Sequence, residues 1–277
     1  MAVEAIEKAL KSAGIDRHDI DLVISACGVG YQTLPSTAPV VMAKLDLADG
    51  SATAFDVNST CLSFLTGIET AHKLLQSGNH KTALVFSSEI ATRALPWETD
   101  PNTAALFGDG AAAVILGYED DVGQGLVASV MKTYPTAYEA CSIAAGGTRF
   151  DFHKQNEEFK SHTMFNMDGK SLFRITRKYF SSVFEELLEK ACWRKQDVDV
   201  VIPHQASPFA LQHMIKATGL NCNQVVNISQ SYGNQIAASI PFTFDYALKS
   251  GKITNGSKVL FIGTAAGVSI GGVAWEM

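Results

Sequence analysis

Apolar positions recur with a helical period at the start of the chain. Val3, Ile6 and Leu10 fall on one face of a helix over residues 1 to 13, and Gly14 follows in the position of a C-terminal cap. The next segment, residues 20 to 25 (IDLVIS), is almost continuously apolar, which is typical of a strand covered on both faces. The pattern therefore predicts a helix followed by a buried strand.

This pair of elements recurs about 176 to 178 positions further along the chain. A second helix is predicted from Arg174 to Ala191, and a second buried strand from Val198 to Pro203. At the same offset, residues 81 to 87 (KTALVFS) match residues 257 to 263 (SKVLFIG), and each of these segments follows a predicted helix. Similarity at one large offset indicates two copies of an α/β unit and not a short repeat.

The two copies divide the chain into an N-terminal half, residues 1–120, and a C-terminal half, residues 121–277. We expect each half to hold a mixed sheet with helices on its faces. A strand is predicted over Gly125–Thr133, ahead of the second copy's first helix, and the first copy has no counterpart before Met1. The first half is therefore expected to be shortened at its N-terminus by one strand, with a sheet edge that is either bare or filled by another chain.

Composition and charge narrow the classes of protein. The chain is 47% hydrophobic and 18% charged with a net charge of −6, and it has no cluster of Lys and Arg that would favour nucleic acid. No apolar stretch approaches the roughly 20 residues that cross a bilayer, and the N-terminus lacks a signal arrangement. An odd number of cysteines without CxxC spacing indicates neither a disulfide framework nor a metal site. We expect a cytoplasmic protein that binds neither nucleic acid nor membrane.

Cys61 is the first candidate for chemistry. Residues 54 to 67 (AFDVNSTCLSFLTG) predict a short strand, a polar turn and a helix that begins at this cysteine. The macrodipole and the free N–H groups of a helix N-terminus favour a thiolate, so the pKa of Cys61 is expected to be lowered. The alternative is a small buried hydrophobic residue, which is the commoner role of a cysteine.

His204 and Asn234 are the other two candidates. His204 directly follows the predicted strand that ends at Pro203, and strand ends are where polar groups gather at a ligand crevice in α/β sheets. Asn234 precedes a helix of small residues, in the region of the second copy that corresponds to the Cys61 region of the first. A structural histidine and an ordinary N-cap are the alternatives. The internal repeat nevertheless places the turns of Cys61 and Asn234 opposite each other.

These segments together resemble β-ketoacyl-acyl-carrier-protein synthase III and its relatives in the thiolase superfamily. The motifs are DVNSTCLSF around Cys61, PHQAS around His204, GNQIAASIP around Asn234, LFGDGAAAVIL and the terminal GTAAGVSIGG. The resemblance covers essentially the whole chain and implies the thiolase fold, with mixed sheets stacked between helices, and a homodimer. Thiolases proper have a second cysteine in the C-terminal turn, which here reads Gly263 to Gly267 without one.

The resemblance also implies a mechanism. The Cys61 thiolate would take the acyl group of an acyl-coenzyme A (acyl-CoA), and the backbone N–H groups of Cys61, Ala266 and Gly267 would hold the oxyanion. His204 and Asn234 would stabilise the enolate that remains when a malonyl thioester, possibly on acyl-carrier protein, loses carbon dioxide. The product would be a 3-oxoacyl thioester, and the reaction implied requires neither a metal nor another cofactor.

Several positions depart from the family pattern. Arg174 and Lys216 keep the basic character of two carrier-docking positions, but Phe209 stands where a third basic residue is usual. Leu34 and Thr264 replace larger aromatic pocket residues, which predicts room for a longer acyl group, and Pro101 replaces the arginine that covers coenzyme A in the family.

Other functions remain open at this stage. Two are enzymatic: condensation of two acyl-CoA molecules without decarboxylation, and synthesis of a starter unit for a secondary metabolite. A third is a non-catalytic subunit that binds acyl groups and pairs with an intact homologue. The complete set of Cys61, His204 and Asn234 favours an enzyme.

Overall fold

The computed structural model describes residues 1–118 and 123–277, and two four-stranded mixed sheets form its framework. The first sheet has the order β2 (Thr53–Asp56), β1 (Leu22–Ser25), β3 (Thr82–Glu89), β4 (Gly110–Gly117). The second has the order β5 (Gly125–Thr133), β10 (Ser269–Glu276), β9 (Lys258–Ala265), β8 (Val200–Pro203). Each sheet contains an antiparallel pair at the end of a run of three neighbouring strands. The pair is β3 with β4 in the first sheet and β9 with β10 in the second.

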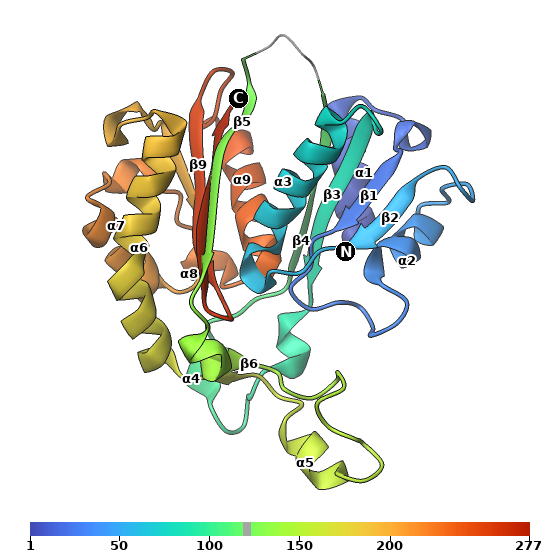
Figure 1. Cartoon of the computed structure of the whole chain (residues 1–277), viewed down its shortest axis with the longest axis vertical. Coiled ribbons are helices and arrows are strands. Elements are labelled where there is room, and N and C mark those ends of the chain that lie inside the picture. The colour runs from blue at the N-terminus through green and yellow to red at the C-terminus, as the bar shows by residue number, and fades with distance from the viewer. Residues whose placement is uncertain (119–122) are drawn as a thin grey trace.

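Helices fill the space between the sheets and cover their outer faces (Figure 1). Helices α3 (Ser63–Gln76) and α9 (Ser239–Lys249) lie between the two sheets and share one apolar core with both of them. The outer face of the first sheet packs against α1 (Ala2–Ala13) and α2 (Thr37–Lys44), and that of the second against α6 (Gly169–Ala191) and α7 (Pro208–Thr218). These layers are the predicted α/β fold with mixed sheets between helices.

The remaining elements are short. The segment between β5 and α6 extends below the sheets in Figure 1, where α4, which precedes β4, also lies. Helix α8 lies just before the Asn234 turn. Their bounds are α4 (Pro101–Ala104), β6 (Cys141–Ser142), α5 (Asn156–Ser161), β7 (Asn166–Met167) and α8 (Ser229–Tyr232). No helix within residues 1–118 and 123–277 combines the length and the apolar character needed to cross a membrane.

Local sequence explains where the main helices begin and end. Gly14 closes α1 in the left-handed conformation, with φ of 66°, as its position after the apolar periodicity predicts. Helix α6 begins five residues before its predicted start because the Asp168 carboxylate accepts hydrogen bonds from the backbone N–H groups of Lys170 and Ser171. The helical pattern predicts the body of each helix, and the capping side chain sets its boundary.

The two-copy arrangement is confirmed. Strands β1 and β8, strands β3 and β9, and helices α3 and α9 occupy equivalent places, and their sequence offsets are those expected from the repeat. The expected boundary between residues 120 and 121 lies outside the described residues.

The expectation that the first sheet would have fewer strands than the second is wrong, because each has four. The reason lies at the far edge of the second sheet, where the counterpart of β2 is reduced to a single bridge between Val201 and Val225. The bare edge itself is present. Strand β4 is outermost in the first sheet, whereas its equivalent β10 is covered by β5.

Candidate active site

Cys61 lies in a tight turn between β2 and α3. It is the middle residue of the 3₁₀ turn η2 (Thr60–Leu62), and Thr60 before it has a positive φ of 50°. The Asn58 side chain accepts a hydrogen bond from the Thr60 N–H at 2.8 Å, and the Ser63 hydroxyl accepts one from the Ser59 N–H at 3.0 Å. These hydrogen bonds hold the backbone in a sharp turn, which directs Cys61 toward the second half of the chain.

The electrostatic environment of Cys61 differs from the expected one. Burial raises the pKa of the thiol, and the Coulomb effects of Cys141 and Glu89 raise it further. Interactions with the backbone of Ala266 and of Cys61 itself act in the opposite direction but are smaller. The predicted lowering is therefore wrong. Helix α3 begins only at Ser63, and desolvation of the thiolate outweighs the helix N-terminus.

Asn234 begins a second turn of the same design. Its side-chain oxygen accepts a hydrogen bond from the N–H of Ile236 at 2.9 Å, and the Ser239 hydroxyl accepts one from the N–H of Gln235 at 3.0 Å. Ile236, which opens turn η7 (Ile236–Ala238), has a positive φ of 49°, as Thr60 does. Asn234 is thus the counterpart of Asn58, and Ala237 lies where the first half has Cys61.

His204 directly follows β8 and is buried, with 4% of its surface exposed. Its backbone N–H donates to the carbonyl of Ile262 on β9 at 2.8 Å, which fixes the residue at the end of the sheet. Burial lowers the pKa of the imidazole to about 4, so the ring is neutral near pH 7. Its Nδ1 has no hydrogen-bond partner among the described residues.

The three candidates come together at the ends of the two inner helices. A Cβ on Gly263 would lie 2.6 Å from the His204 Cβ and 3.1 Å from Leu62, so only glycine lets His204 approach the Cys61 turn. The turns η2 and η7 contact each other. The Asn234 side chain donates to the carbonyl of Ala206, two residues beyond His204, at 3.4 Å.

Ala266, Gly267, Thr264 and Leu34 were predicted as the oxyanion turn and the acyl pocket. The Ala266 carbonyl accepts a hydrogen bond from the Thr60 hydroxyl at 3.3 Å, and the Ala266–Gly267 turn follows β9 beside the Cys61 thiol. Thr264 lies on β9 and is half-buried, whereas Leu34 is 86% exposed in the loop before α2. In this single chain Leu34 points to solvent, so its place in an acyl pocket stays a prediction.

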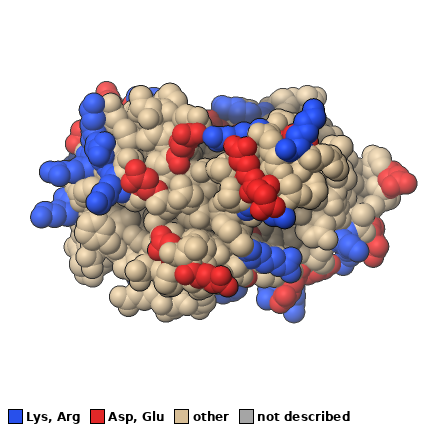
Figure 2. Space-filling view, turned by 90° about the horizontal axis from the view of Figure 1, so that it is seen from below, with Lys and Arg blue, Asp and Glu red and all other residues tan. Residues whose placement is uncertain are grey.

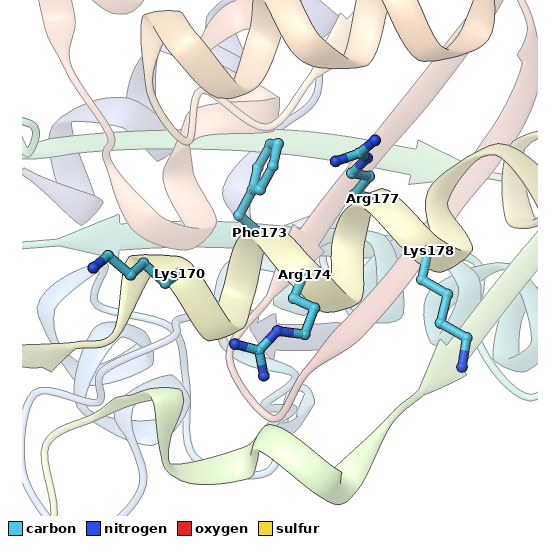
Figure 3. Close-up of a pocket in the computed structure, with 5 residues that line it drawn as sticks. All are labelled: Lys170, Phe173, Arg174, Arg177 and Lys178. Atoms are coloured by element: carbon cyan, nitrogen blue, oxygen red, sulfur yellow. The ribbon is translucent and has the colours of Figure 1, made fainter.

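Arg174 and Lys216 lie on the outer helices, away from Cys61. Lys170, Phe173, Arg174, Arg177 and Lys178 line a depression of about 430 Å³ on α6. In Figure 3 Phe173 and Arg177 project from one side of the helix, and Arg174 and Lys178 project from the other. Lys216 lines a neighbouring depression of about 500 Å³. Seen from below, basic side chains gather at one end of the molecule, on the side of these helices (Figure 2).

Two residues near the thiol were missed by the sequence reasoning. Glu89, the last residue of β3, is completely buried and accepts hydrogen bonds from the N–H groups of Gly28 and Val29. The signal that would have found it is an acidic residue closing a strand whose middle, ALVF, is continuously apolar (TALVFSSE). Cys141 on β6 comes close enough to influence the pKa of Cys61, although the two are 80 residues apart, and no local pattern predicts this contact.

Two family models match this chain. The model of 3-oxoacyl-[acyl-carrier-protein (ACP)] synthase III matches residues 55–135, and that of the C-terminal part of the same enzyme matches residues 188–277. The β-ketoacyl-[acyl-carrier-protein] synthase III of Neisseria meningitidis serogroup B is 33% identical over 277 residues, covering 99% of this chain and 82% of the relative. That of Clostridium perfringens is 32% identical over 272 residues, covering 98% of this chain and 82% of the relative.

Solved structures agree with these relatives. The 3-oxoacyl-[acyl-carrier-protein] synthase III of Aquifex aeolicus has a TM-score of 0.88 at 30% identity, covering 100% of this chain and 83% of the other. The priming β-ketosynthase of the R1128 polyketide pathway has a TM-score of 0.89 at 26% identity, covering 100% and 80%. The fold and the comparisons define a condensing acyltransferase with the thiolase fold. The chain belongs to the β-ketoacyl-acyl-carrier-protein synthase III family.

Proposed function

We propose that this chain condenses an acyl-CoA primer with a malonyl thioester to give a 3-oxoacyl thioester. The observation that carries the proposal is the meeting of the Cys61 turn, His204 and the Asn234 turn at the boundary of the two halves. A nucleophile, a neutral imidazole and an amide are the groups that acyl transfer followed by enolate formation needs.

In the first half-reaction the Cys61 sulfur attacks the carbonyl of the acyl-CoA. The Cys61 S–C bond forms, the thioester C–S bond to coenzyme A breaks, and the thiol proton ends on the released coenzyme A. Burial raises the pKa of Cys61, so the sulfur carries its proton before the attack. Burial also keeps the imidazole of His204 neutral, and a neutral imidazole can accept that proton as the sulfur attacks. The backbone N–H groups of Cys61 and of the Ala266–Gly267 turn hold the oxyanion.

In the second half-reaction a malonyl thioester loses carbon dioxide. The bond between the α-carbon and the carboxylate breaks, and its electron pair passes into an enolate whose oxygen accepts hydrogen bonds from His204 and Asn234. The α-carbon then attacks the acyl group on Cys61, the bond between the acyl carbon and the Cys61 sulfur breaks, and the departing sulfur takes up one proton from solvent. A low-dielectric site strengthens both hydrogen bonds, because His204 and Asn234 are both buried.

We propose that the acceptor arrives on acyl-carrier protein and docks on the outer face of α6 and α7. Arg174 and Lys216 each line a depression there, and the first depression is lined by Phe173 together with the cations Lys170, Arg174, Arg177 and Lys178. We also propose a cytoplasmic homodimer. The dimer is supported by the loop after β1, which exposes the apolar side chains of Val29, Tyr31 and Leu34, and by β2, which is an edge strand of the first sheet.

A second candidate, synthesis of a starter unit for a secondary metabolite, uses the same site. It is favoured by the likeness to the R1128 priming β-ketosynthase. The two functions differ in the acyl primer and in the carrier of the acceptor thioester. A panel of substrates therefore separates them.

Intact-protein mass spectrometry tests the proposal. Incubation with a panel of acyl-CoA thioesters should add one acyl group, peptide mapping should place it on Cys61, and malonyl thioester should then remove it with release of carbon dioxide. Cys61→Ser should abolish the adduct, whereas Cys222→Ser, at an exposed cysteine, should not. Removal by a second acyl-CoA without carbon dioxide would indicate the non-decarboxylative reaction. Absence of any adduct on Cys61 would reject catalysis and leave an acyl-binding subunit.

A further inference from the structure

Glu89 is a buried acid that the proposed reaction does not use. It ends β3, where alternate side chains face opposite layers: Ala83 and Val85 join the inner core, and Leu84 joins the outer one. Glu89 shares the register of the inward-facing residues, so its carboxyl points into the layer that holds Cys61. It has no ion-pair partner within the described parts of the chain, although a buried carboxyl normally requires one.

Backbone N–H groups take the place of that partner, and they come from both halves. Gly28 and Val29, in the loop after β1, donate to the two carboxyl oxygens at 2.5 Å and 3.2 Å. The backbone of Ala237, in turn η7 of the second half, also stabilises the ionised carboxyl. A single side chain therefore joins the first sheet to the turn that follows Asn234.

The same loop reaches the Cys61 turn. The Asn58 amide donates to the carbonyl of Gly28 at 3.0 Å, and the Asn58 oxygen accepts from Thr60 N–H at 2.8 Å. A Cβ on Gly28 would lie 2.6 Å from the Ile236 side chain and 3.3 Å from both the Thr60 backbone and the Glu89 carboxyl. The loop after β1, the Cys61 turn and turn η7 thus pack tightly around Gly28. Glu89 binds two of them, the loop and turn η7.

We propose that Glu89 is a positioning residue, which holds the turn of Cys61 in register with the turn of Asn234 through the backbone of Gly28, Val29 and Ala237. The proposal rests on the proposed function for its catalytic meaning. It goes beyond that function by assigning the geometry between nucleophile and enolate site to one buried side chain. Displacements of about 1 Å in such a geometry can cost a hundredfold in rate.

The charge of Glu89 supplies an independent readout. Burial raises its pKa to about 8, so it is ionised where the thiol of Cys61 titrates, and its charge raises the pKa of that thiol. Other titratable groups face the same space: Cys141 from β6 influences Cys61, His204 comes from the end of β8, and Cys27 after β1 is influenced by Glu89. All of these remain in a Glu89 variant, so a change can be assigned to Glu89.

The test compares Glu89→Gln, which removes the charge, with Glu89→Asp, which keeps the charge and shortens the reach. In both, condensation should fall by about tenfold or more relative to acyl loading in single turnover. The pH midpoint of Cys61 alkylation by iodoacetamide, followed by peptide mass, should move down in Glu89→Gln and stay in place in Glu89→Asp. Ser87→Ala is the matched control, because Ser87 is buried on the same face of β3 and its hydroxyl donates to the Ala26 carbonyl.

Two outcomes overturn the proposal. One is a wild-type ratio of condensation to loading in both variants; the other is an unchanged alkylation midpoint in Glu89→Gln. Should Glu89→Gln not fold, the kinetic ratio in Glu89→Asp decides alone. Alkylation needs no acyl substrate, so its result is independent of the proposed reaction, whose failure would appear as a wild-type protein that takes no acyl group.

Discussion

The buried imidazole of His204 predicts a specific loss of stability in acid. Its pKa lies near 6.5 in an unfolded chain and is lowered to about 4 in the folded protein, because burial disfavours the charged ring. As pH falls through 6.5, the unfolded chain takes up a proton at this residue and the folded protein does not. The stability that neutral His204 allows is therefore present above pH 6.5 and is lost progressively as pH falls to about 4.

The magnitude follows from the size of the shift. A lowering of about 2.5 units at about 1.4 kcal/mol per unit gives a loss of about 3 kcal/mol in the free energy of unfolding. Such a loss is a large part of the roughly 5 to 15 kcal/mol that stabilises a typical domain. Carboxylates add their own pH dependence, so the prediction concerns the difference between two proteins that share them.

Urea unfolding between pH 7 and pH 4, followed by tryptophan fluorescence, measures this difference. Wild type should lose about 3 kcal/mol more than His204→Asn over the window, whatever the stability of each at pH 7. A control variant at the exposed His18, His18→Asn, should follow wild type. Parallel pH profiles for wild type and His204→Asn would refute the argument that burial keeps this ring neutral.

Three further predictions concern activity. Asn234→Ala should reduce condensation by about a hundredfold and acyl loading by less than about threefold, since the proposed reaction uses its amide only to bind the enolate; equal losses in single-turnover measurements would reject this assignment. Gly263→Ala should cost about 1 to 3 kcal/mol by urea unfolding and impair condensation, because the new Cβ displaces His204; unchanged kinetics would show that the close approach is unnecessary. Arg174→Glu should raise the KM for a carrier-bound malonyl thioester about tenfold and leave that for malonyl-coenzyme A unchanged; Lys252→Glu, at another exposed cation, is the control.

Much of the fold could be predicted from the hydrophobic periodicity of the sequence. The helix that ends at Gly14 and the buried strand after it are local patterns, and the second copy repeats them at one offset. The number of strands in each sheet did not follow, because pairing is a tertiary property. Val225 has the apolar surroundings of a strand but keeps only one bridge to Val201.

The candidate site was predictable in position but not in its electrostatics. A cysteine before a helix is visible in sequence, whereas burial, which raises the pKa of Cys61, is a tertiary property. The pKa of Cys61 also depends on distant segments, since Cys141 raises it and the backbone of Ala266 lowers it. Glu89 was missed for the same reason, since one acidic residue at a strand end has meaning only when the backbone of Gly28 and Ala237 is seen to converge on it.

The repeated turn explains how one local structure serves two chemical roles. Asn58 and Asn234 occupy the same place, and each accepts a hydrogen bond from the N–H two residues ahead. The Asn58 amide is engaged by the carbonyl of Gly28 at 3.0 Å, whereas the Asn234 amide makes a longer contact of 3.4 Å with the carbonyl of Ala206. A longer hydrogen bond is weaker and easier to exchange for a substrate oxygen. The first copy of the turn therefore supplies a fixed support for Cys61, and the second holds the Asn234 amide by a longer bond, as the proposed contact with an enolate requires.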